Sequence, residues 1–285
     1  MRLRCDNNKQ GFTLVEISVV MVIIGLLAAG ILVGSSIMKS AELQKVASNF
    51  IKFRDATKQF HDKYKYFPGD FPEAASFWEL ADVCGGNPTD PVKATCDGNG
   101  DGVVGGSVGN PLQFGAEFRE PLYFWQHLTN AGFLEGAYTG RGATGGSDWW
   151  DPGVNLPIGM DENSAYTFSY SAHGTTAYGI VYPEIGNVDN YTFELNYGHV
   201  IVYGNPRDIG NRRTASGMAL SGAEALSLDQ KIDDGKPGLG NVVTIPKTQD
   251  GGSTYLCVDS TNATSAVYVT SSDAKRCSII FITGL

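Results

Sequence analysis

The chain has 285 residues, of which 42% are apolar and only 18% are charged, so it is long enough for one or two domains with a sizeable core. Its 36 glycines show no three-residue period, which excludes collagen and indicates a fold rich in loops. Acidic residues outnumber basic residues by 30 to 21, giving a net charge of −9, without the basic surplus of a nucleic-acid-binding surface. The 14 Phe, 13 Tyr and 4 Trp exclude a generally disordered chain.

A basic stub precedes a long apolar segment at the amino terminus. Arg2, Arg4 and Lys9 come before residues 12–38, in which Glu16 is the one charged residue among 27. A helix of that length spans about 40 Å, more than the hydrocarbon core of a bilayer needs. Because positive flanks stay in the cytoplasm, the sequence predicts that the helix crosses a membrane and that the rest of the chain lies outside the cytoplasm.

Two simpler interpretations of this segment remain open. A secretory signal peptide would be cut near Val33-Gly34-Ser35, and a plain single-pass anchor would stay uncut. A signal peptide explains neither the length of the apolar run nor the acid inside it. A plain anchor does not explain Glu16, because a central carboxylate costs roughly 3 kcal/mol in a membrane helix.

Residues Gly11-Phe12-Thr13-Leu14-Val15-Glu16 resemble the processing motif of type IV prepilins and type II secretion pseudopilins. The resemblance implies that a prepilin peptidase cuts after Gly11 on the cytoplasmic side and methylates the new terminus at Phe12. It also implies that Glu16 pairs, in a filament, with the amino group of a neighbouring subunit and so helps to fix the register. Many family members have a proline where Val33 stands, so a proline kink is not expected here.

The same resemblance implies partners and a location. The partners are other pilin or pseudopilin subunits, the prepilin peptidase, the inner membrane and its assembly platform, and the charge gives no reason to expect nucleic acid. The chain would be a single-pass protein of a bacterial inner membrane with its head in the periplasm. After assembly it would belong to a periplasmic or extracellular filament.

The helical pattern continues beyond the apolar segment. Residues 39–66 contain no proline or glycine, and Phe67-Pro68-Gly69 is expected to end the helix. We therefore predict a leader at 1–11, an assembly helix at 12–38, an amphipathic spine helix at 39–67 and a head at 68–285, with a short coiled-coil stalk as the alternative for the spine. Its apolar face, at alternating spacings of three and four, is Leu43, Val46, Phe50, Phe53, Thr57, Phe60 and Tyr64.

The fold is predicted to be α+β and pilin-like, with the long helix packed on an antiparallel β-sheet head that carries long loops. Helices are expected at 114–132, ending at Gly132, and from a capping box at Ser221 to about 233–235. Tyr66-Phe-Pro-Gly-Asp70 and Asp229-Gln-Lys-Ile-Asp-Asp-Gly235 weakly resemble a group of pilin-like proteins with large heads. Strands are expected at 166–173, 177–182, 191–203, 253–258, 266–270 and 278–283.

Four cysteines lie on the exported side, and three pairings are possible. Proximity in sequence favours Cys84–Cys96 and Cys257–Cys277. Zinc binding by the cysteines is the alternative, but the chain has no C-x-x-C and no paired histidines. Disulfides are therefore favoured over zinc. The Cys257–Cys277 loop resembles the carboxy-terminal disulfide loop of many pilins.

Asp97-Gly-Asn99-Gly-Asp101-Gly102 matches the first half of an EF-hand-type loop, whose hard oxygen ligands suit Ca²⁺. The carbonyl of Val103 would be the next ligand. Val108 stands where the usual glutamate belongs, and Glu117 or Glu120 would have to replace it. The alternative is a polar turn without metal. A second acidic cluster, at Asp229, Asp233 and Asp234, is interpreted as a helix end.

Catalytic motifs are not apparent in this sequence. The four histidines lie in no recognisable nucleophile motif, and neither G-x-S-x-G nor H-E-x-x-H occurs, so we do not expect an enzyme. His127 lies in an apolar helical context and is expected to be packed. Trp149, Trp150 and Tyr138 are assigned to the core, with a binding patch as the alternative.

The sequence thus predicts a structural subunit of a type IV pilus or a type II secretion pseudopilus, assembled through its amino-terminal helix. A head of 218 residues is large for a major subunit. A minor or tip pilin that acts as a surface- or carbohydrate-binding adhesin is therefore the alternative, and a membrane-anchored exported hydrolase is a third.

Overall fold

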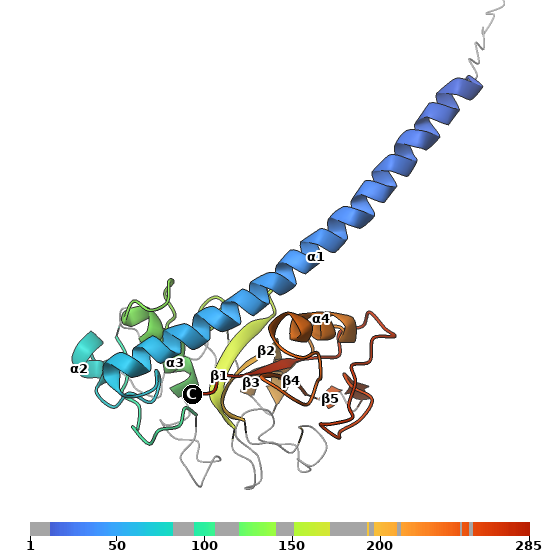
Figure 1. Ribbon diagram of the computed structural model, residues 1–285. Helices are drawn as coiled ribbons and strands as arrows, with labels where there is room; N and C mark the ends of the chain where they lie inside the picture. Colours follow the sequence, from blue (N-terminus) through green and yellow to red (C-terminus); the bar gives the residue numbers. More distant parts are fainter. Residues whose placement is uncertain are drawn as a thin grey trace, which may run out of the picture. The chain divides into compact units, whose positions relative to one another are not determined.

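The computed structural model describes residues 12–81, 94–105, 120–140, 151–171, 193, 197–209, 212–245, 247–250 and 253–285 (Figure 1). The chain divides into two compact units, Met1–Glu42 and Leu43–Leu285. The second unit contains the remainder of the long helix together with the head.

The first helix, α1, runs from Leu14 to Tyr64 and has 51 residues, close to the single helix expected from the sequence. In the first unit, the large apolar side chains of α1 that the structure describes, from Leu14 to Met38, are exposed. Among the described residues, α1 is the one helix long and apolar enough to cross a membrane. Such an apolar surface is stable only when lipid or other helices cover it.

From Leu43 onward α1 buries the face that its period predicts. Every member of that face from Leu43 to Phe60 is at most 4% exposed, and Tyr64 is half-buried. Phe50 stacks on Phe281 at 4.5 Å between ring centroids, and Phe53 meets Trp125 and Tyr166 edge-on at 4.9 and 5.1 Å. Burying each such ring contributes about 1.5–3 kcal/mol, so this seam holds the helix to the head.

A five-stranded antiparallel sheet forms the centre of the head. Its order is β1-β2-β7-β4, and β3 pairs with the far half of β2 (Figure 1). A separate two-stranded sheet joins β5 to β6. The strands are β1 Ala165–Ser171, β2 Gly198–Ile209, β3 Arg212–Gly217, β4 Val242–Thr244, β5 Lys247–Asp250, β6 Ser253–Leu256 and β7 Ile279–Ile282.

Three short helices complete the head: α2 Ala74–Trp78, α3 Glu120–Asn130 and α4 Gly222–Ile232. The Leu43–Tyr64 part of α1, with α3 and α4, covers one face of the sheet (Figure 1). Successive strand residues alternate between the two faces, so that Ile201 and Phe281 join this main core, whereas Val200, Val202 and Ile280 form a second cluster.

Several local predictions are confirmed. The helix expected at 114–132 is α3, which is followed by Gly132 in a left-handed conformation at φ 77°. Its expected first residues lie outside the described part of the chain. The capping box is also present, since Ser221 N–H donates to Glu224 Oε2 at 2.6 Å and Glu224 N–H donates to Ser221 Oγ at 3.3 Å.

The strand predictions were partly wrong. Residues 266–270 form no strand but a single bridge between Val258 and Tyr268, because backbone pairing there is limited to the bonds from Asp259 N–H to the Val267 carbonyl and from Val269 N–H to the Cys257 carbonyl. The side chain of Tyr268 donates its hydroxyl to Asp229 in α4. The segment expected at 253–258 ends as β6 at Leu256 and pairs with β5 rather than with the main sheet. The strand expected at 191–203 begins only at Gly198 and runs on to Ile209. The one expected at 177–182 lies outside the described residues.

Replacing Phe53 by Ala should lower the free energy of unfolding by about 3–5 kcal/mol, because it leaves a cavity between Trp125 and Tyr166. Ile51→Ala is the matched control, since Ile51 is 45% exposed on the other side of the same helix and should change stability by less than about 0.5 kcal/mol. Denaturant titration of the detergent-solubilised chain, followed by tryptophan fluorescence, measures both. Equal effects of the two changes would contradict the packing described.

Candidate functional site: the start of the amino-terminal helix

The predicted processing and assembly residues stand at the very start of α1. Phe12 is 83% exposed and precedes the helix, and Glu16 lies in its first turn. Gly11, the predicted cleavage residue, lies outside the described residues.

Glu16 forms a reciprocal cap with Thr13. The backbone N–H and the hydroxyl of Thr13 both donate to Glu16 Oε2, at 2.7 and 2.8 Å, and Glu16 N–H donates to Thr13 Oγ1 at 3.2 Å. This is a Thr-x-x-Glu capping box, which satisfies backbone donors that the helix itself cannot satisfy. Sequence reasoning missed this role of Thr13, although the spacing of three residues was visible.

The helix then presents a continuous apolar surface. The exposed large apolar residues of this part are Leu14, Val15, Ile17, Val19, Val20, Met21, Val22, Ile23, Ile24, Leu26, Leu27, Ile31, Val33, Ile37 and Met38. This apolar surface needs to be covered by lipid or by similar helices. Glu16 is the one carboxylate within it, in residues 12–38.

Comparison with known families supports this interpretation of the amino terminus. The model of the prokaryotic N-terminal methylation motif matches residues 6–32, which include Phe12, Glu16 and most of the apolar segment. The chain has the amino-terminal segment of the type IV pilin and pseudopilin family. This segment makes it a pilin-like substrate of prepilin peptidase. No curated protein and no solved structure matches the chain.

The head contains the loop for which calcium binding was predicted, and the predicted ligand side chains there accept hydrogen bonds from backbone N–H groups of α2 and of the loop itself. Asp97 Oδ1 accepts from the N–H of Ala75 at 2.8 Å. Asn99 Oδ1 accepts from Asp101 N–H at 2.8 Å, and Asp101 Oδ1 accepts from Val103 N–H at 3.0 Å. These are Asx-type turns, which curl the loop and leave further lone pairs on each side chain.

Two buried carboxylates hold this loop from inside. Asp70, fully buried, accepts from the N–H groups of Asp101 and Gly102, both at 3.0 Å. Glu120, 1% exposed, accepts from the N–H groups of Asn99 and Gly105 at 3.0 and 3.1 Å. Sequence reasoning missed Asp70, which lies far from the loop in sequence, and named Glu120 only beside Glu117, which lies outside the described residues.

The glycine before Asp70 explains how these acids come together. Gly69 has φ 89°, and a Cβ there would collide with the backbone carbonyl of Glu120. The short turn after α1 therefore has to carry glycine at this position if α3 is to approach it. The Tyr66-Phe-Pro-Gly-Asp70 motif thus places a carboxylate against the start of α3.

Burial makes both acids hard to ionise. Desolvation raises the pKa of Asp70 to about 6 and that of Glu120 to about 8. The N–H donors of the loop oppose these increases in pKa, whereas the negative charge of Asp101 adds to both. The loop is thus built around two carboxyl groups, of which Glu120 favours the protonated form near neutral pH, whereas Asp70 does so only below about pH 6.

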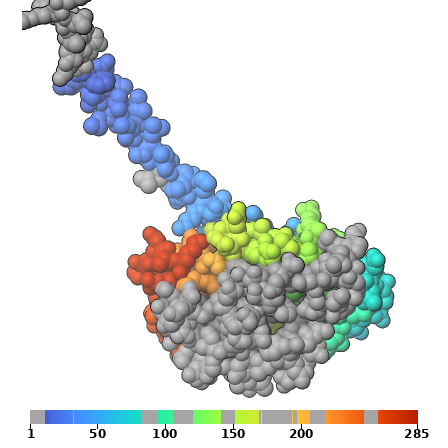
Figure 2. Space-filling model, turned by 180° about the vertical axis from the view of Figure 1, so that it is seen from behind, coloured from blue at the N-terminus to red at the C-terminus, as the bar shows by residue number. Residues whose placement is uncertain are grey.

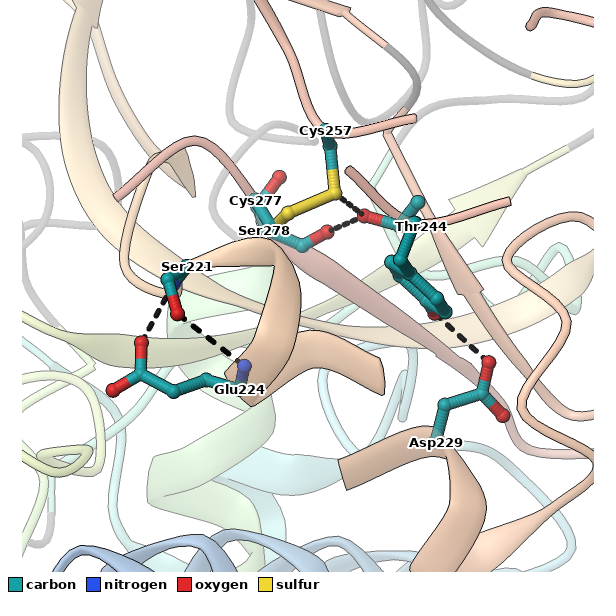
Figure 3. The surroundings of a disulfide bond; sticks show 8 residues. Ser221, Glu224, Asp229, Thr244, Cys257, Cys277 and Ser278 are labelled. Atoms are coloured by element: carbon teal, nitrogen blue, oxygen red, sulfur yellow. Dashed lines mark hydrogen bonds between the residues drawn. A yellow bond between two sulfur atoms is a disulfide. The ribbon is translucent and has the colours of Figure 1, made fainter. Parts of the chain in front are cut away.

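The second acidic cluster ties the end of α4 to its neighbours, as Figure 3 shows for Asp229. Asp229 Oδ2 accepts from the Tyr268 hydroxyl at 2.8 Å, and burial raises the pKa of Asp229 to about 6. Asp233 accepts from the N–H groups of Asn241 and Val242 at the start of β4. Asp234 accepts from the N–H of Lys236 at 2.8 Å. The carboxylate oxygens of the three acids lie within 4.8 Å of one another, a spacing that a metal ion would also fit.

A disulfide joins Cys257 to Cys277, and it closes the loop that packs on α4 (Figure 3). The hydroxyl of Thr244 donates to the carbonyl of Ser278 at 2.6 Å and lies 3.2 Å from Cys257 Sγ, which links β4 to this disulfide. Cys96 is also disulfide-bonded, and Cys84 lies outside the described residues.

His127 is packed, as its apolar context predicts. Its Nδ1 accepts from Gly69 N–H at 3.0 Å, so Nε2 carries the proton and donates to Thr95 Oγ1 at 3.1 Å. Burial lowers the pKa of His127 to about 3, which keeps the ring neutral. Tyr138 is half-buried against the main core, whereas Trp149 and Trp150 lie outside the described residues.

Glu120 should make the head less stable as the pH rises. Its pKa in the folded chain, about 8, lies above the ordinary glutamate value of 4.5, so its stabilisation is complete below pH 4.5 and is lost as the pH rises towards about 8. Asp70 adds a similar loss that ends near pH 6. The melting temperature of the wild type in chelator should therefore fall between about pH 6 and 8, and in Glu120→Gln this fall should be absent.

Glu162→Gln serves as the control, because Glu162 is exposed and its replacement should leave the pH profile of the melting temperature unchanged. A Glu120→Gln profile that still parallels the wild type between pH 6 and 8 would contradict the assignment.

Proposed function

We propose that this chain is a structural subunit of a type IV pilus or of a type II secretion pseudopilus. Prepilin peptidase cuts it after Gly11, methylates Phe12, and the product polymerises through the first part of α1. The observation that carries the proposal is the methylation motif over residues 6–32, which lies at the start of a helix that exposes large apolar side chains from Leu14 to Met38. Its function is therefore assembly rather than turnover.

The chemistry of assembly follows from two charges. Cleavage would leave an α-amino cation at Phe12, four residues before Glu16. In a bundle of apolar helices each charge alone is expensive, and a close pair between neighbouring chains removes most of that cost. In the single chain Glu16 accepts from Thr13 instead, so the carboxylate has donors both before and after assembly.

Partners and location follow from the same mechanism. Before assembly the chain would lie in the bacterial inner membrane with its head in the periplasm. In that membrane it would meet the assembly platform and the prepilin peptidase, which cuts on the cytoplasmic side. The apolar segment would then leave lipid for contacts with the same segment of other subunits. The switch is feasible because lipid tails and packed apolar side chains are similar environments for such a surface.

Replacing Glu16 by Ala should abolish filaments while leaving cleavage intact, because the bond to be cut precedes Phe12 and the variant removes only the counter-charge. Glu42→Ala is the matched control, since Glu42 is an exposed glutamate of the same helix outside the apolar segment. Sheared filament yield and an immunoblot for leader removal measure the two steps separately. Normal filaments from Glu16→Ala would contradict the proposed assembly through the amino-terminal helix.

We further propose that the loop holds Ca²⁺ through Asp97, Asn99, Asp101 and the carbonyl of Val103, with Glu120 in place of the missing glutamate. Oxygen ligands of this kind suit calcium, and every one of these side chains retains lone pairs beyond the hydrogen bonds described. The burial that raises the pKa values of Asp70 and Glu120 favours the proposal as well, because a divalent cation would supply the positive charge that buried carboxylates need.

Calcium should raise the melting temperature of the wild-type chain relative to chelator, most strongly near pH 8, where the carboxylates would otherwise ionise unpaired. An Asp97→Asn/Asp101→Asn variant should melt at one temperature in both media. Identical melting of the wild type in calcium and in chelator would remove the metal from the account and leave the polymer proposal untouched.

A further inference from the structure

Charge is divided unevenly between the spine part of α1 and the rest of the head. Residues 43–66 contain six Lys and Arg against two Asp and Glu. Residues 67–285 contain 11 Lys and Arg against 25 Asp and Glu, a net charge of −14. A positive helix on a strongly negative head offers two surfaces that attract each other between copies.

The positive surface is the side of α1 that faces away from its buried stripe. Lys45, Lys52 and Lys58 are exposed there, around Ile51, which is 45% exposed. We call these four residues the basic face. Of these three lysines, Lys52 alone has an ion pair among the described residues, 4.0 Å from Glu135, whose side chain is 97% exposed. Such an exposed ion pair contributes little to stability, so the positive charge of the basic face remains available to attract a partner.

The negative surface lies where α1 ends. Residues 66–81 and 94–105 contain no Lys, Arg or His, and hydrogen bonds such as Ala81 N–H to the Thr95 carbonyl at 2.9 Å hold the two segments together. Glu73 and Glu79 are exposed there beside Phe77 and Leu80, which are 56% and 62% exposed. We call these four residues the acidic tip, and Asp97 and Asp101 add exposed acids to it. In Figure 2 this part of the chain, in cyan, forms one edge of the head.

We propose that the acidic tip of one copy docks on the basic face of a second copy of this chain. The inference rests on the proposed function and names the contact between heads. Glu73 and Glu79 would meet Lys45 and Lys52, and Phe77 or Leu80 would cover Ile51. The pattern matches an interface in which a small apolar centre is surrounded by complementary charges.

A second copy fits this contact because both halves are present in one chain and lie apart. From Lys45 to the end of α1 is about 30 Å along the helix, so one head can use both surfaces at once. The two surfaces differ, which makes the contact heterologous. Heterologous contacts that do not close into a ring give open helical arrays, the geometry that a filament needs.

Charge reversal tests the contact in cells that assemble the full chain. Lys45→Glu/Lys52→Glu and Glu73→Lys/Glu79→Lys should each lower filament yield by about tenfold or more, because like charges then face one another. Combining the four changes in one chain should restore the yield to within about threefold of wild type, because the attraction returns with its sign exchanged. Lys231→Glu/Lys236→Glu, two exposed lysines near the end of α4, should leave it unchanged.

Cross-linking tests the same contact without filaments. Chains with Lys45→Cys and chains with Glu79→Cys are expressed together and treated with a bismaleimide, and a dimer should form only when both are present. No dimer, a dimer from either variant alone, or an adduct with a different protein would overturn the docking proposal. Unchanged filament yield in either reversal variant would overturn it too, whereas absence of wild-type filaments alongside the dimer would count against the filament role alone.

Discussion

A carboxylate on an apolar helix has to be neutralised wherever that helix is buried, and this constraint governs the amino-terminal part of the molecule. Glu16 is charged, and the side chains that follow it are exposed and apolar. In the single chain the cap formed with Thr13 supplies donors. In a bundle of identical helices the amino group released at Phe12 is the nearest new cation, so processing and pairing become one chemical requirement.

The head also has to stabilise buried carboxylates, but it does so with backbone N–H donors rather than with a cation. Asp70 and Glu120 are buried without a cation among the described side chains around them, and the structure compensates with backbone N–H groups from one curled loop. Four such bonds satisfy the carboxyl oxygens but do not fully offset the loss of solvent, which is why burial raises both pKa values. The loop, the turn after α1 and the start of α3 are consequently one hydrogen-bonded unit whose stability is expected to depend on pH.

Periodic features could be predicted from the sequence, and long-range ones could not. The face of α1 from Leu43 to Phe60 follows from spacings of three and four, and the α4 cap follows from Ser221 and Glu224. Strand β4 has only three residues, too few for any period to emerge. The expected strand at 266–270 was wrong because backbone pairing there stops at one bridge, between Val258 and Tyr268, and no local pattern shows how far such pairing extends. Asp70 was missed because its partners lie about 30 residues further along the chain, and no local pattern connects them.

The intact mass of the chain recovered from the outer side of the membrane tests the central claim most directly. The account requires a chain that starts at Phe12 and carries one methyl group on its amino terminus, with the whole apolar segment retained. A chain that starts near Ser36 would show ordinary secretion, and the pairing of Glu16 with a neighbouring amino group would then have no place in its function.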